Sequence, residues 1–170
     1  GIGDFIAGLH HDFLCTGEVF GGLNNDDQEE FAAELVATVM LAVFAVRFKT
    51  EADAQKPQNA VSIAACINKA LLNFVYTIGN HDNWQLQDGA NPLGTFRSKL
   101  TAILVEQIQK MLVDARLPAV DVSDIVRSKM TLVPQHRPQY RFSSGLVMGL
   151  HHPYMGRAKT SSLRAQEELK

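Results

Sequence analysis

Residues 25–46 read NDDQEEFAAELVATVMLAVFAV and set the architecture expected of the chain. Asn25 or Asp26 can cap a helix by accepting hydrogen bonds from its first N–H groups, and the acids that follow suit the positive end of the helix dipole. Downstream, only Glu34 and Thr38 interrupt a run that is apolar nearly all round. Because a helix that is apolar on every side has to be buried, we expect this one in the centre of a helical bundle.

The hydrophobic period of the remaining chain predicts further helices and almost no strands. Lys56-Pro57 breaks the first helix, and an apolar stripe that includes Phe74 and Ile78 predicts a second one over residues 59–78. A third helix is expected from Thr95 to about residue 115, and a short fourth one over residues 123–130. The expected fold class is mainly α: a compact bundle of three long helices plus one or two short helices, with an irregular N-terminal lead and an extended C-terminal arm.

Length and composition describe one globular domain. The chain has 170 residues, of which 46% are hydrophobic and 20% charged, so it is too apolar for a disordered protein. Its two cysteines are too few for a disulfide scaffold and are expected to be free thiols. The most apolar run, residues 31–46, is short for a membrane span and contains Glu34, and no secretory signal is recognised. We therefore expect no membrane span and a place in the cytoplasm or within an assembled particle.

Charge is segregated along the chain although the net charge is only −2. Residues 1–55 carry ten acids and two bases, whereas residues 125–170 carry eight bases and two acids. Such a polarity affects association with charged partners and does not determine the fold. The expected organisation is a helical core domain over residues 1–130, whose first 24 residues form the irregular lead, and a basic C-terminal arm over residues 131–170.

No set of residues carries a convincing signature of catalysis or of a bound cofactor. His10, His11 and Cys15 resemble metal ligands, but the chain has no paired C-x-x-C or H-x-x-x-H element, and we predict no metal site. Ser143-Ser144-Gly145 is not a nucleophile elbow, and His81-Asp82 are neighbours that rarely aim at one point. We predict no catalytic residues and no cofactor. A small enzyme or ligand binder that uses the loop over residues 79–94 stays open as an alternative.

The basic arm is the most unusual feature, because it interleaves bases with aromatic side chains. Tyrosine and arginine are common anchors at protein interfaces. The residues expected to make such contacts are Arg137, Tyr140, Arg141, Phe142, Tyr154 and Arg157. The matching acidic surface is the start of the first helix, which is formed by Asp26, Asp27, Glu29 and Glu30. Docking of the arm on the acidic half of its own chain is a further alternative.

These observations predict a non-enzymatic structural protein that self-associates or docks into a larger particle, filament or machine. The arm of one copy would dock on the acidic helix start of the next copy, in a head-to-tail contact that builds rings or filaments. The alternative is a coat-like protein that packages nucleic acid, because arginine neutralises phosphate and aromatic rings stack on unpaired bases. The residues assigned to that alternative are Arg127, Lys129, Arg137, Arg141, Arg157 and Lys159.

Overall fold

The computed structural model describes residues 25–79, 92–133 and 139–150 of the chain. Most of these residues are helical, and two short pairs of strands complete the described fold. In chain order the elements are α1 (Asn25–Gln55), α2 (Ala60–Ala70), β1 (Phe74–Thr77), α4 (Pro92–Asp114), α5 (Ser123–Ser128), β2 (Met130–Val133), β3 (Gln139–Arg141) and β4 (Val147–Gly149). Only α1 and α4 are long, at 31 and 23 residues, whereas α2 has 11.

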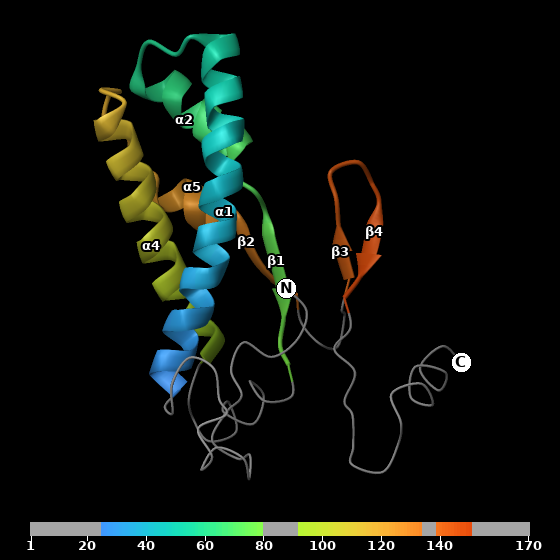
Figure 1. Ribbon diagram of the computed structural model, residues 1–170. Coiled ribbons are helices and arrows are strands. Elements are labelled where there is room, and N and C mark those ends of the chain that lie inside the picture. The colour runs from blue at the N-terminus through green and yellow to red at the C-terminus, as the bar shows by residue number, and fades with distance from the viewer. Residues whose placement is uncertain (1–24, 80–91, 134–138, 151–170) are drawn as a thin grey trace, which may run out of the picture.

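Helix α1 lies along α4 and packs against α2, so these three helices form the body of the molecule (Figure 1). α1 begins at Asn25, as its sequence predicts, and ends before Lys56, which takes a left-handed φ of 47°. The chain then turns into α2, which begins with a reciprocal cap. Asn59 accepts a hydrogen bond from the backbone N–H of Ser62, and the Ser62 hydroxyl accepts one from the backbone N–H of Asn59.

The second predicted helix is too long, because its last part is a strand. The helix ends at Ala70, and the run Phe74–Thr77 forms β1, which pairs in parallel with β2. Aromatic and β-branched side chains favour a strand, and a parallel partner supplies the hydrogen bonds that the helix would have made. The buried hydroxyl of Thr77 also donates to the carbonyl of Val133, at 3.1 Å. The fourth helix likewise ends early, at Ser128, and β2 runs across the domain boundary expected after residue 130.

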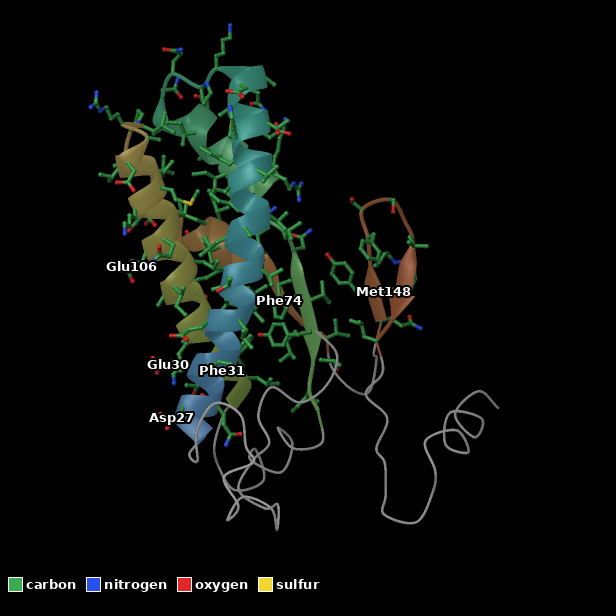
Figure 2. The ribbon with its side chains drawn as sticks, in the orientation of Figure 1. Asp27, Glu30, Phe31, Phe74, Glu106 and Met148 are labelled. Atoms are coloured by element: carbon green, nitrogen blue, oxygen red, sulfur yellow. The ribbon has the colours of Figure 1, made fainter. Side chains whose placement is uncertain are left out.

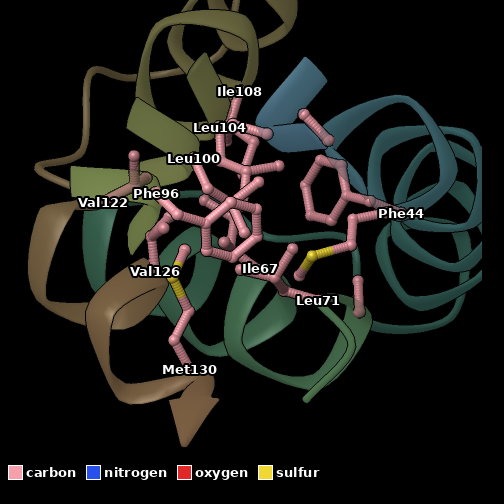
Figure 3. Close-up of a cluster of buried hydrophobic side chains, with 14 of the residues drawn as sticks. Phe44, Ile67, Leu71, Phe96, Leu100, Leu104, Ile108, Val122, Val126 and Met130 are labelled. Carbon is pink, nitrogen blue, oxygen red and sulfur yellow. The ribbon is translucent and has the colours of Figure 1, made fainter. Parts of the chain in front are cut away.

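The hydrophobic core lies between α1, α2 and α4 and is closed by α5 and the first strand pair (Figure 3). α4 contributes one buried side chain per turn from a single face, formed by Phe96, Leu100, Leu104 and Ile108. α1 faces them with Ala33, Ala37, Met40 and Phe44. On β1, the rings of Phe74 and Tyr76 lie 6.1 and 6.0 Å from the ring of Phe96. Strand β1 therefore extends the core that the helices begin.

Only one face of α1 is buried by the described parts of the chain, so within these parts α1 is not buried on every side as its sequence predicts. Leu35, Val39 and Val46 are 54%, 63% and 69% exposed, although they are as apolar as the residues on the core side. Successive residues of an α-helix turn by about 100°, which places these three opposite Ala37 and Phe44. α1 is thus an apolar helix with one packed side and one open side.

Helix α1 extends well beyond the apolar run of residues 31–46 on both sides. By length and composition, residues Asp27–Gln55 are sufficient to cross a membrane, and 22% of the most apolar 18-residue window is buried. The apolar run that appears too short for a membrane span, residues 31–46, is therefore part of a helix that meets this criterion.

Candidate assembly surfaces

In the described part of the basic arm, residues 131–133 belong to β2, and residues 139–150 form a β-hairpin instead of the extended chain expected. β3 and β4 pair antiparallel, with Tyr140 opposite Met148 and Arg141 opposite Val147. Ser143-Ser144-Gly145 is the turn between them: the Gly145 N–H donates to the Phe142 carbonyl at 2.9 Å, and the Phe142 N–H donates to the Leu146 carbonyl at 2.8 Å. Gly145 closes this three-residue turn with a φ of 85°, a left-handed conformation that residues with a side chain rarely adopt.

One face of the hairpin is entirely apolar. Directly opposite residues share a face, as do residues two apart on one strand. The face therefore holds Tyr140, Phe142, Leu146 and Met148, and we call it the hairpin face. The rings of Tyr140 and Phe142 meet edge to face at 5.0 Å, which confirms their common orientation. Gln139 and Arg141 lie on the opposite face together with Val147.

Three of the four side chains of the hairpin face are exposed, Tyr140 is half-buried, and the hairpin stands outside the helical body. Leu146 is 66% exposed, and Phe142 and Met148 also remain open to solvent. The two strands pack mainly on each other, and Figure 1 shows the hairpin standing to one side of the helices. Of the arm residues expected at an interface, the structure brings together Tyr140, Arg141 and Phe142. The others, Arg137, Tyr154 and Arg157, lie outside the described residues.

Among the described carboxylates at the acidic start of α1, those of Asp27 and Glu30 are exposed. Asp27 is exposed, and Glu30 is exposed with its carboxylate 3.7 Å from the ammonium of Lys99. Glu29 is only 5% exposed, because it lies on the inner side of the helix, and it is not available for docking. Asp26 is in the first turn of α1, but its side chain is not among those described. Figure 2 shows Asp27 and Glu30 at one end of the body, away from Met148 on the hairpin.

Of the six bases assigned to nucleic-acid binding, the structure describes Arg127, Lys129 and Arg141. Arg127 lies 3.4 Å from the carboxylate of Asp124 within α5. Lys129 is half-buried, and this desolvation, together with the charge of Arg47, lowers the pKa of its ammonium group. Arg141 is exposed on the hairpin, and Arg137, Arg157 and Lys159 lie outside the described residues. Arg127 is thus exposed but paired with Asp124, and Lys129, directly after α5, is only partly open to solvent.

A groove of about 630 Å³ runs between α4 and the start of α5. Its lining residues are Gly94, Arg97, Ser98, Thr101, Ala102, Val105, Ser123 and Arg127. The hydroxyls of Ser98 and Thr101 already donate to the backbone carbonyls four residues earlier in α4. Arg127 is offset by Asp124 and lies close enough to Asp121 to help lower the pKa of that carboxyl. The lining therefore holds two arginines and no acidic residue; Arg127 is paired with Asp124, and Arg97 donates to the Arg127 carbonyl at 3.5 Å.

The described residues hold no group of three or more side chains that would bind a metal ion. Cys66 is a buried free thiol within α2. The residues considered for metal binding or catalysis elsewhere, namely His10, His11, Cys15, His81 and Asp82, lie outside the described ranges, and so does most of the 79–94 loop. Ser143 and Ser144 belong to the hairpin turn.

Comparison of the chain with models of known protein families, with curated proteins and with solved structures gives no match in any of the three. Its function therefore has to be argued from its own surfaces.

Proposed function

We propose that this protein is a structural, self-assembling component whose hairpin docks on a neighbouring copy. The observation that carries the proposal is the hairpin face, which exposes Phe142, Leu146 and Met148 outside the helical body. A single two-stranded hairpin is marginally stable in water, and it gains stability when its apolar face is covered. Large exposed apolar faces on a small domain are typical of interaction sites.

The acidic first turn of α1 in the next copy is the matching surface. Arg141 lies on the side of the hairpin opposite the hairpin face, turned away from the apolar contact, so it would sit at the rim of the interface. From there its guanidinium can pair with Asp27 or Glu30, which are the exposed carboxylates of that turn. Rim charges of this kind guide the encounter and select the register, while the apolar face supplies most of the affinity.

The contact joins two different surfaces of the same chain. In the structure, the described hairpin and the first turn of α1 lie apart (Figure 2), and the proposal therefore joins surfaces of two different copies. A contact between unlike surfaces of identical copies leaves one of each surface free at the ends of a pair. It therefore continues into rings or filaments and does not stop at a dimer.

Sedimentation velocity of the full chain over a concentration series tests this assembly. The double variant L146S/M148S removes two apolar side chains from the hairpin face, and we expect its self-association to weaken at least tenfold. The single variant V147S is the matched control, because Val147 is similarly exposed but lies on the opposite face. Circular dichroism should show the same helix content in both, since neither change touches the core.

The ion pair proposed between Arg141 and Glu30 is tested by reversing the charge of each side chain. R141E should weaken association at low salt, and R141E combined with E30R should restore it if the two side chains meet. A wild-type chain that stays monomeric at every concentration would refute the proposal. So would equal association constants for L146S/M148S and V147S.

A further inference from the structure

The open side of α1 carries an apolar seam of its own, formed by Leu35, Val39, Ala42 and Val46. These residues are separated by four, three and four positions, which is the spacing of the contact residues in paired helices. All four are exposed, and three of them are large apolar side chains. Since the core side of the same helix is fully packed, the seam is a second, separate apolar face of α1.

We propose that this seam is an interface between two copies of the chain, with their α1 helices packed side by side and antiparallel. If the two-fold axis passes between Met40 and Leu41, positions whose numbers sum to 81 face each other. Leu35 then lies opposite Val46 of the second copy, and Val39 lies opposite Ala42 of the second copy. The same surface serves both copies, so the contact closes as a dimer.

The side chains along the seam suit this arrangement. Val39 against Ala42 sets a larger side chain opposite a small one, so that the two central layers interlock. Thr38 and Ala45, which flank the seam on one side, are small and exposed. Small flanking residues allow the helix axes to approach to about 8–10 Å.

Charge also favours the antiparallel arrangement. Glu34 and Lys49 are both exposed and lie on the flank that carries Thr38 and Ala45. In the antiparallel pair, Lys49 of one copy falls within about 3 Å along the axis of Glu34 of the other, and symmetry repeats this contact. Lys49 now pairs with Asp53 of its own helix at 2.8 Å, with both side chains open to solvent. Such surface pairs are weak and can be exchanged.

A second copy fits the seam better than a lipid bilayer does. The exposed seam extends over twelve residues, or about 17 Å from the first to the last, whereas the hydrocarbon core of a bilayer is about 30 Å thick. Helix α4 lies along α1 and exposes Arg97, Glu106 and Lys110. These charges would enter the hydrocarbon if α1 crossed a membrane together with the helix packed on it.

The decisive measurement is made in the L146S/M148S chain, so that the seam is separated from the hairpin contact. We expect this protein to sediment as a dimer. Adding V39K should weaken the dimer at least tenfold, because each dimer loses two buried valines and gains two buried charges. Adding V113K instead should change nothing, since Val113 is equally open to solvent but lies on α4.

The register is tested by charge exchange in the same background. E34K and K49E should each weaken the dimer, and the double exchange E34K/K49E should restore it. Parallel helices would set Lys49 beside Lys49 and would give no rescue.

Three results would overturn the proposal: a monomer before V39K is added, equal dimer constants for V39K and V113K, or no rescue by the double exchange. Flotation of the monomeric protein with phosphatidylcholine vesicles, abolished by V39K, would assign the seam to a membrane instead. Failure of the hairpin proposal would look different, because the chain would then be a dimer with or without L146S/M148S.

Discussion

Tyr76 illustrates how the core acts on one titratable side chain. It is 1% exposed and lies between the rings of Phe74 and Phe96, at centroid distances of 5.4 and 6.0 Å. Burial raises the pKa of its hydroxyl above the usual value near 10, because the phenolate would lose its water, and the charge of Arg97 opposes this only in part. In the unfolded chain, the same hydroxyl ionises at its ordinary pKa.

The stability of the protein should therefore fall as the pH rises above about 10. There the unfolded chain releases the Tyr76 proton while the folded chain still holds it, which favours unfolding. The variant Y76F keeps the ring and removes the proton, so its free energy of unfolding should decline less steeply between pH 9 and pH 11. Urea midpoints over this range measure the difference. Y140F, which changes a tyrosine outside the core, should decline as the wild type does, and equal slopes for all three proteins would contradict the argument.

At the level of elements, the sequence predicts the mainly helical character of the described chain, but it overestimates the length of the second helix and misses the strands. The acidic start and the apolar run of residues 25–55 predict α1, and Ser123 correctly predicts the start of α5. β1 and β2 have only four residues each and are stabilised by each other across a long stretch of chain, so no local period reveals them. The hairpin did leave a signal, since Tyr140 and Phe142 alternate with polar residues before Ser143-Ser144-Gly145 and an apolar run, residues 146–148, follows it.

The formation of the hairpin should depend on the backbone conformation of Gly145 in its turn. G145A places a side chain on a residue with a φ of 85°, and this left-handed conformation costs about 1–2 kcal/mol. We expect the amide signals of residues 139–149 to lose their strand shifts in NMR spectra, while the helical signals stay unchanged. Gly149 is the matched control, because its φ is not left-handed and a Cβ would meet no atom within 4 Å. A folded hairpin in G145A would show that the turn tolerates the strain.

For the molecule as a whole, the sequence predicts which residues are buried more reliably than it predicts which surfaces stay open. The apolar period of α4 correctly marks Phe96, Leu100 and Leu104 as core residues. The same reasoning buries α1 on all sides, but the described chain contains too few elements to surround a 31-residue helix. The hydrophobicity of a helix face indicates that its burial is favourable. It does not indicate whether the residues that bury it belong to the same chain.

Phe96 joins the most parts of the core, so its removal tests whether the body unfolds as one unit. F96A leaves a cavity between α4, β1 and α5, and we expect a loss of about 3–5 kcal/mol in the free energy of unfolding. Urea unfolding followed by circular dichroism measures it. V113A, at an exposed site of the same helix, should stay within about 0.5 kcal/mol of the wild type. A small loss in F96A would mean that α4 is not integral to the body.

The parallel pairing of β1 with β2 also affects how the chain folds during its synthesis. Thr77 can pair only with Val133, which lies 56 residues further along the chain. A ribosome therefore delivers β1, with its two aromatic rings, long before the partner strand has been synthesised. During that interval the nascent chain is most in need of a chaperone, and slowing translation between residues 78 and 133 should lengthen its exposure to aggregation.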